Sequence, residues 1–117
     1  MNTILHITRG EKWKQAQLAG MYRADSLDSE GFIHCSTPKQ IIKVANNFFA
    51  NQKGLVLLFI DSDQVKAEIR YEAAEVDELF PHIYGALNID AVFKFVDFNP
   101  GKDGFFQMCP ELQKISE

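Results

Sequence analysis

The sequence predicts an α+β domain with a small split or mixed β-sheet and two short helices. Helix start signals followed by apolar residues at helical spacing occur at only two places in the chain. The other apolar segments are short and rich in β-branched and aromatic residues, and they do not alternate regularly with helices as a repeating βαβ unit requires. With 117 residues, the chain is long enough for one domain, 1–117, and for a packed core.

The first strand and the first helix are predicted from the opening residues. Residues 3–7 are apolar and typical of a strand, and Thr8-Arg9-Gly10-Glu11 has the form of a capping box. We therefore expect a short helix that starts after Thr8 and ends at Gly20. Trp13 and Ala16 would form its inner face.

A second strand and helix follow a polar segment. Residues 21–30 lack periodicity and are expected to form a loop, whereas residues 32–35 read as a strand. Thr37 as N-cap, Pro38 as the first helical residue and Gln40 at the third position predict the start of the second helix. Its core-facing stripe consists of Ile41, Val44, Ala45, Phe48 and Phe49.

The second half of the chain is mainly β. Residues 55–60 are continuously apolar, which predicts a strand buried on both faces. Residues 67–72 alternate between apolar and polar, and residues 91–98 form another candidate strand. A loop at 99–104 would let residues 105–108 return as a hairpin partner.

Charge and hydropathy exclude several classes of function. A net charge of −4 and a pI near 5.3 do not favour duplex nucleic acid as a partner. The longest apolar run is too short to cross a bilayer, and no secretory apolar segment follows Met1, so we expect a cytoplasmic protein without a membrane partner. Cys35 and Cys109 could pair, although cytoplasmic cysteines are normally reduced.

Three histidines, His6, His34 and His82, each lie inside an apolar or aromatic segment. A polar ring in such surroundings needs a hydrogen-bond partner, so each histidine is expected to have either a structural or a functional role. Side-chain alternation places His34 and Ser36 on one face of the second strand and Cys35 on the other. We expect His34 and Ser36 to face a cleft, and His6 to share that site.

Further candidate residues lie near these histidines in the sequence or on neighbouring strands. His82 and Tyr84 share a face of a short segment that Pro81 opens. Tyr22 and Ser26 lie in the segment before the second strand, which could close over a ligand or simply connect two elements. Glu72 falls on the polar face of its strand, where solvent exposure is the simplest interpretation.

The segments GFIHCS (31–36) and PHIYG (81–85), with the opening ILHI (4–7), resemble a family of small bacterial proteins known as domain of unknown function 952. The likeness extends over nearly the whole chain. That family in turn looks like a remote relative of the ADP-ribosyltransferase superfamily, which includes the RNA 2′-phosphotransferases.

The resemblance implies a small split-sheet fold that holds NAD, or an ADP-ribosylated group, in a cleft. In the superfamily, a histidine on the first strand contacts a ribose, a histidine or tyrosine on the second lines the cleft, and a later glutamate polarises a ribose hydroxyl. His6 and His34 fall at the first two positions, and Glu72 or His82 at the third. The implied catalytic residues are thus His6, His34 and Glu72, with NAD as co-substrate for ADP-ribosyl or phosphoryl transfer.

The implied contacts to a nucleotide-like small molecule come from five further side chains: Tyr22, Ser26, Ser36, His82 and Tyr84. Two alternatives remain open. One is a non-catalytic module that binds a ligand or a protein, and the other is a hydrolase with a three-histidine metal site. No glycine-rich phosphate loop is present, so neither a Rossmann dehydrogenase nor a P-loop kinase is indicated.

Overall fold

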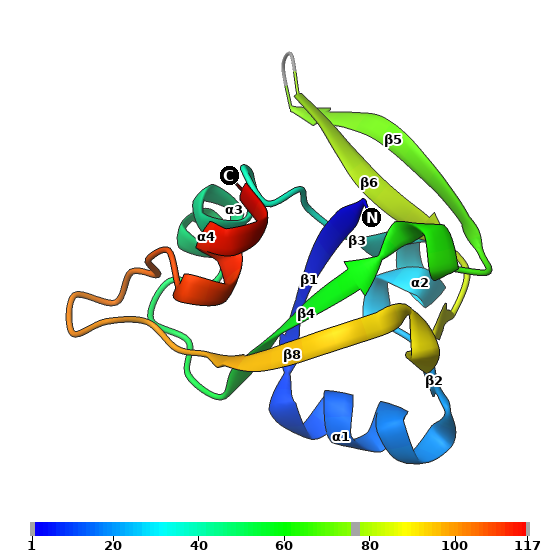
Figure 1. The fold of residues 1–117 in the computed structure, drawn as a ribbon, viewed down its shortest axis with the longest axis horizontal. Coiled ribbons are helices and arrows are strands. Elements are labelled where there is room, and N and C mark those ends of the chain that lie inside the picture. The colour runs from blue at the N-terminus through cyan, green and yellow to red at the C-terminus, as the bar shows by residue number, and fades with distance from the viewer. Residues whose placement is uncertain (1, 76–77, 117) are drawn as a thin grey trace.

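The computed structural model describes residues 2–75 and 78–116 and confirms the α+β class (Figure 1). The first half of the chain contains β1 (Thr3–Arg9), α1 (Gly10–Ala19), β2 (Met21–Tyr22), α2 (Asp25–Glu30), β3 (Ile33–His34) and α3 (Ile41–Phe48). The second half contains β4 (Leu55–Asp61), the 3₁₀ turn η1 (Ser62–Gln64), β5 (Glu68–Glu75), β6 (Glu78–Tyr84), β7 (Leu87–Asn88), η2 (Ile89–Ala91), β8 (Val92–Phe98) and α4 (Pro110–Ser116).

The β-structure is split into three sheets. One has the order β1-β4-β8, a second has the order β3-β6-β5, and β2 pairs with β7. Every pairing between the described strands is antiparallel, so the sheet is split rather than mixed. Among the described residues, one isolated bridge, between Leu5 on β1 and Ser36 just after β3, joins the two three-stranded sheets.

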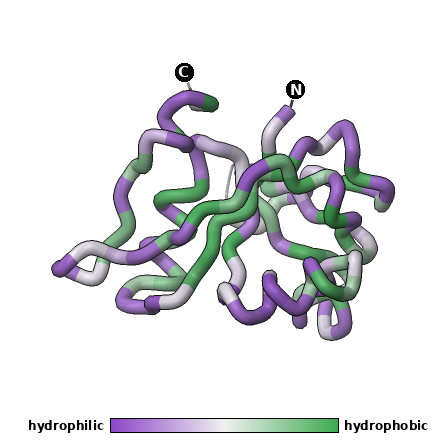
Figure 2. Tube along the Cα trace, turned by 60° about the horizontal axis from the view of Figure 1, so that its bottom comes forward, coloured by the Kyte–Doolittle hydropathy of each residue, from purple (hydrophilic) through white to green (hydrophobic). Residues whose placement is uncertain are grey.

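The central strand β4 contributes to two hydrophobic cores. Val56, Leu58 and Ile60 face the first core, which also holds Trp13 of α1 and Ile83 of β6. The alternate residues of β4 face the second core, against α3 and α4. Figure 2 shows the apolar trace running through the middle of the molecule and the polar residues at its periphery. The prediction of a strand buried on both faces is therefore confirmed, because β4 is flanked by a sheet neighbour on each side and a core on each face.

The predicted capping box at Thr8 is wrong. β1 continues to Arg9, and α1 begins at Gly10 without a side-chain cap. The Thr8 hydroxyl instead lies 2.9 Å from the hydroxyl of Tyr22. The predicted end of the helix is confirmed: Gly20 adopts φ +84° and its N–H donates to the Ala16 carbonyl.

Residues 21–30 form β2 and α2 rather than a loop. α2 has no buried residue, so it leaves no apolar periodicity in the sequence to predict it. Ion pairs from Lys12 to Asp25 and from Arg23 to Asp28 hold it to the surface, and Gly31 ends it at φ +91°.

The second predicted helix is present as α3, but its predicted start is wrong, because it begins at Ile41 with Gln40 as N-cap rather than at Pro38. The Ile41 N–H donates to the Thr37 carbonyl (3.2 Å), and residues 38–40 form a turn that leads into the helix. The side chain of Gln40 accepts from the Thr37 N–H at 2.9 Å, as in a capping box. Ile41 and Ala45 are buried as predicted, but Phe48 is 65% exposed and is not a core residue.

The predicted hairpin partner at 105–108 is wrong. These residues are irregular and lead into α4, a helix that the sequence analysis missed. The side chain of Asn46 explains the difference, because it accepts from the Phe106 N–H (2.6 Å) and donates to the Phe106 carbonyl (3.2 Å). A side chain of α3 thus takes the place of a paired strand. No helix in the described part of the chain is long and apolar enough to cross a membrane.

Candidate functional site

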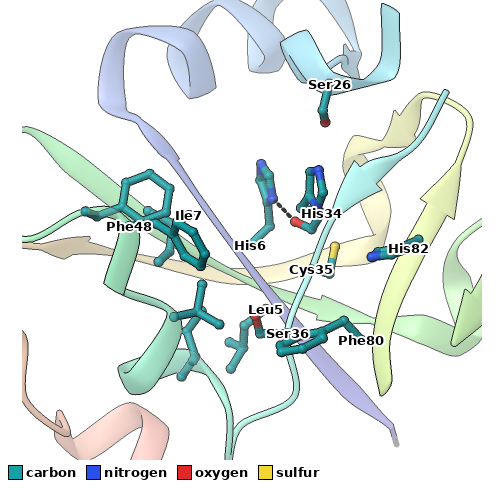
Figure 3. Close-up of a pocket in the computed structure, with 13 residues that line it drawn as sticks. Leu5, His6, Ile7, Ser26, His34, Cys35, Ser36, Phe48, Phe80 and His82 are labelled. Carbon is teal, nitrogen blue, oxygen red and sulfur yellow. Dashed lines mark hydrogen bonds between the residues drawn. The ribbon is translucent and has the colours of Figure 1, made fainter. Parts of the chain in front are cut away.

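A cavity of about 420 Å³ opens between β1, α2, β3, α3 and β6 (Figure 3). Its polar lining residues are His6, Ser26, His34, Cys35, Ser36 and His82. Its apolar lining residues are Leu5, Ile7, Ile41, Val44, Phe48, Phe49 and Phe80. Figure 3 shows Phe48 on one side of His6 and His34 and His82 on the other, whereas Phe80 lies beside Ser36.

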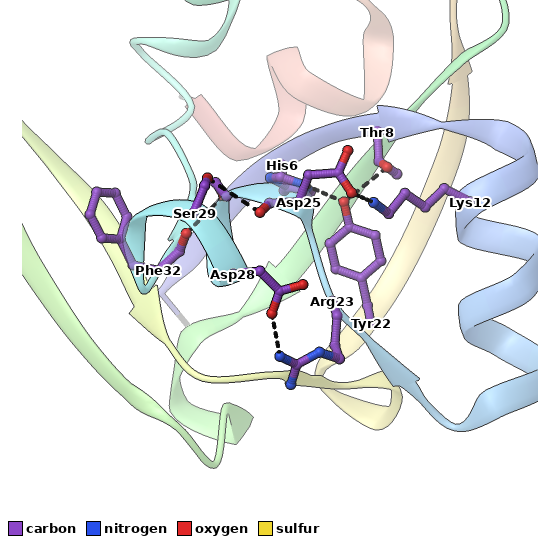
Figure 4. A network of polar contacts seen from close by, with 10 residues as sticks. His6, Thr8, Lys12, Tyr22, Arg23, Asp25, Asp28, Ser29 and Phe32 are labelled. Atoms are coloured by element: carbon purple, nitrogen blue, oxygen red, sulfur yellow. Dashed lines mark hydrogen bonds and ion pairs between the residues drawn. The ribbon is translucent and has the colours of Figure 1, made fainter.

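His6 lies in the middle of β1 and both of its ring nitrogens are engaged. Nδ1 lies 2.5 Å from the His34 carbonyl oxygen (Figure 3), and Nε2 lies 2.7 Å from the Tyr22 hydroxyl (Figure 4). A carbonyl oxygen only accepts, so Nδ1 carries a proton. In the neutral ring, Nε2 then accepts from Tyr22, and the Tyr22 oxygen can accept from the hydroxyl of Thr8.

Burial determines the charge state of this network. Desolvation lowers the pKa of His6 from 6.5 to about 4, so the ring is neutral at pH 7. Burial likewise raises the pKa of Tyr22 to about 12. His6 therefore joins β1 to β3 as a neutral structural connector, and both of its nitrogens are already occupied when the cavity is empty.

His34 and His82 lie directly opposite each other on β3 and β6, and their ring centroids are 5.4 Å apart. His34 is the more open of the two, and its Nε2 lies 2.9 Å from a Glu30 carboxylate oxygen. Phe32 packs edge-on against His34 (4.9 Å) and stacks on His82 (4.1 Å, 19°). This packing fixes the direction of both rings.

The carboxylate of Glu72 holds the His82 ring in place through a hydrogen bond. Glu72 on β5 accepts from His82 Nδ1 at 2.8 Å and from the Tyr84 hydroxyl at 2.5 Å. The hydrogen bond from Tyr84, and then that from His82, hold the pKa of Glu72 below its ordinary value. His82 Nε2 is buried and has no hydrogen-bond partner among the residues that the structure describes.

The remaining polar residues that line the cavity are Ser26, Ser36 and Cys35. Ser26 donates to the Phe32 carbonyl (2.7 Å), and the backbone of Ser36 is bonded to Leu5 in both directions (2.8 Å each). Burial raises the pKa of the Cys35 thiol, so it stays protonated and unreactive. Cys35 and Cys109 are both free thiols.

The structure brings five of the eight predicted site residues to the cavity lining: His6, Ser26, His34, Ser36 and His82. Two of the other three contact a lining histidine directly, Tyr22 at His6 and Glu72 at His82. Tyr84 lies one contact further away, because it donates to Glu72. Glu72 therefore reaches the cavity only through the His82 ring.

Sequence reasoning missed the apolar lining residues of the cavity. The helical stripe that ends in Phe48 and Phe49 was predicted to pack entirely in the core, but both rings line the cavity. Consecutive positions of a helical stripe commonly face one core, so the sequence contains no signal that Phe48 is exposed, and Phe49 packs against the second core as well as lining the cavity. Phe80, which lies on β6 two residues before His82, carried no such signal either.

The donor set does not suit the three-histidine metal site. Within residues 2–75 and 78–116, no three His, Cys, Asp or Glu side chains converge as metal ligands. His6 has no free nitrogen, since its two nitrogens contact the His34 carbonyl and Tyr22.

Comparison with known proteins identifies the family of this chain. No curated protein matches the chain. Among solved structures, the crystal structure of protein CC0527 from Caulobacter crescentus superposes with a TM-score of 0.87 at 28% identity, covering 95% of this chain and 98% of that one. A double mutant of CC0527 gives the same values, and its solution NMR structure gives a TM-score of 0.80 at 29% identity over 92% and 93% of the two chains. The model of the family described as "Protein of unknown function (DUF952)" matches residues 7–95, and the chain belongs to that family.

Proposed function

We propose that this protein binds the nucleoside end of an NAD- or ADP-ribose-like ligand in the cavity between β3 and α3. One observation carries the proposal: one cavity is lined both by histidines and serines and by aliphatic and aromatic side chains. A nucleoside combines the same two characters, because its base is a flat, largely apolar ring and its ribose is covered with hydroxyls.

The chemistry of the cavity lining favours binding of the nucleoside part of such a ligand over binding of its phosphates. Phe48, Phe49 and Phe80 offer faces and edges to a ring, and His34 and Ser36 offer polar atoms to hydroxyls. None of the described lining residues is Lys or Arg, so a diphosphate has no cationic partner inside the cavity. We therefore expect the phosphates to remain at the mouth, in solvent.

The volume of about 420 Å³ lies within the range that small-ligand sites usually have, roughly 300–1,000 Å³. The resemblance to the ADP-ribosyltransferase superfamily supports the same ligand class. The split antiparallel sheets are compatible with that relationship.

ADP-ribosyl or phosphoryl transfer is the second candidate, and the Glu72–His82 pair favours it. A carboxylate that holds one nitrogen of a histidine is the usual support for a general base. No carboxylate lines the cavity among the described residues, however, and a developing positive charge on a ribose needs one close by. Binding is therefore the better-supported function.

Calorimetric titration tests binding directly. Adenosine, nicotinamide riboside, NAD and ADP-ribose are titrated into the wild type, Phe48→Ala and Phe93→Ala. Phe93 is a matched control, because it is a similarly exposed phenylalanine that lies on β8 and does not line the cavity.

We expect saturable binding that Phe48→Ala weakens and Phe93→Ala leaves unchanged. A dinucleotide that binds no more tightly than its nucleoside would support phosphates outside the cavity. If none of the four compounds binds the wild type, the proposal is wrong. Incubation of the bound complexes with NAD or with 2′-phosphorylated RNA ends then separates a binding protein from a transferase by the presence of released nicotinamide or transferred phosphate.

A further inference from the structure

The side chain of His82 is 6% exposed and satisfied at only one of its two nitrogens. Nδ1 is held by Glu72, whereas Nε2 is buried without a hydrogen-bond partner among the described residues. Buried polar atoms are nearly always paired in folded proteins, so an unpaired one in a cavity wall indicates a partner that enters the cavity.

Glu72 determines what kind of partner Nε2 can take. The lowered pKa of Glu72 keeps its side chain a carboxylate, which only accepts hydrogen bonds. Nδ1 must therefore carry the proton, and in the neutral ring Nε2 is left with a lone pair. A partner of the neutral ring must be a hydrogen-bond donor.

The surroundings of the His82 ring further restrict which hydrogen-bond donors can reach Nε2. Phe32 stacks on His82 and fixes the ring plane, and His34 lies opposite at 5.4 Å between centroids. Both histidines line the cavity beside Ser36. A small polar group that reaches this side of the cavity thus meets His34, His82 and Ser36 together.

We propose that His82 Nε2 accepts a hydrogen bond from one ribose hydroxyl of the bound nucleoside, and that Glu72 is the positioning residue that fixes the tautomer. This inference rests on the proposed function and makes it specific: the ligand is a ribonucleoside, selected through a hydroxyl. Nε2 has less than 1 Å² of free surface, so ligand entry shifts the side chains that cover it.

The first test combines a variant with altered ligands. Wild type and His82→Phe are titrated with adenosine and nicotinamide riboside and with the 2′-deoxy and 3′-deoxy analogues of each. Phenylalanine keeps the stacking on Phe32 and removes both nitrogens. We expect His82→Phe to weaken the ribonucleoside by about tenfold, as for the loss of one buried hydrogen bond.

The same interaction should be lost when the hydroxyl is removed. One deoxy analogue should bind the wild type about tenfold more weakly, and His82→Phe should cause little additional loss with that analogue. Equal binding of the ribonucleoside by wild type and His82→Phe would overturn this inference and leave the proposed function intact. No binding of any nucleoside to the wild type would overturn both.

A second test does not depend on the stability of His82→Phe. In ¹⁵N NMR spectra recorded where the ring is neutral, wild-type His82 should show the proton on Nδ1, and its Nε2 resonance should move at saturating ribonucleoside. Glu72→Ala should release the ring into a mixture of tautomers, whereas Glu68→Ala should not. Glu68 is a matched control on the same strand, where it pairs with Arg70. An unchanged Nε2 resonance at saturation, or one tautomer in Glu72→Ala, would contradict the assignment.

Discussion

The neutral, buried ring of His6 predicts that this protein loses stability in mild acid. We consider His6→Asn, because the asparagine side chain can still donate to the His34 carbonyl from nearly the same place but does not titrate. The quantity of interest is the difference in free energy of unfolding between wild type and His6→Asn as a function of pH. All other titrating groups are common to both proteins and largely cancel in that difference.

The sign follows from the lowered pKa. The folded protein resists protonation of His6 down to pH about 4, whereas the unfolded chain takes up the proton near pH 6.5. The contribution is therefore fully present above pH 6.5 and is lost as the pH falls toward 4. A gap of about 2.5 pH units, at about 1.4 kcal/mol per unit, amounts to about 3.5 kcal/mol in full, of which about 3 kcal/mol is lost by pH 4.

Urea unfolding, repeated at intervals between about pH 7.5 and pH 4, measures the free energy of unfolding of both proteins. Small domains have a total stability of roughly 5–15 kcal/mol, so a change of this size is readily measured. We expect the advantage of the wild type over His6→Asn to shrink steadily below pH 6.5, by about 3 kcal/mol at pH 4. A difference that does not change with pH would refute the reasoning, because it would mean that His6 has the same pKa in the folded and unfolded states.

Three further predictions concern stability. Tyr22→Phe removes the hydroxyl that contacts His6 Nε2, and the loss of a buried hydrogen bond should lower the free energy of unfolding by about 1–3 kcal/mol in urea titrations. Asn46→Ala removes both bonds to the Phe106 backbone, so it should cost about 1–3 kcal/mol and speed hydrogen exchange at the Phe106 amide. Gly104→Ala places a Cβ at φ +85° and should cost about 1–2 kcal/mol, seen as a lower midpoint of thermal unfolding; an unchanged midpoint would contradict the left-handed backbone at this position.

The elements that the sequence predicted are those whose packing leaves a local pattern. The continuous apolar run of β4 and the stripe of α3 record burial directly, and Gly20 marks a left-handed helix end. α2 left no such pattern because it buries no residue and is held by ion pairs to Lys12 and Arg23. Such partners lie outside the helix itself, so no local window contains them.

The candidate site, too, was predicted only where a local pattern in the sequence reflects it. Strand alternation predicted that His34 and Ser36 would face a cleft, and both line the cavity. Its prediction that Cys35 would face the other way is wrong, because β3 ends at His34 and Cys35 lines the same cavity. It could not predict that Glu72 would reach the cavity only through His82, because that depends on the register of β5 against β6. Register is strongly specified by which face of a strand is buried, and burial is a property of the tertiary structure.

The bridge between Leu5 and Ser36 has a consequence for how a ligand would affect stability. Two backbone hydrogen bonds at this pair, with the adjacent bond from His6 to the His34 carbonyl, join the β1-β4-β8 and β3-β6-β5 sheets. The first hydrophobic core packs across the same junction, because it holds Leu58 of β4 together with Ile83 of β6. The cavity lies at this junction, so a bound ligand would contact both sheets at once and would stabilise their association against unfolding.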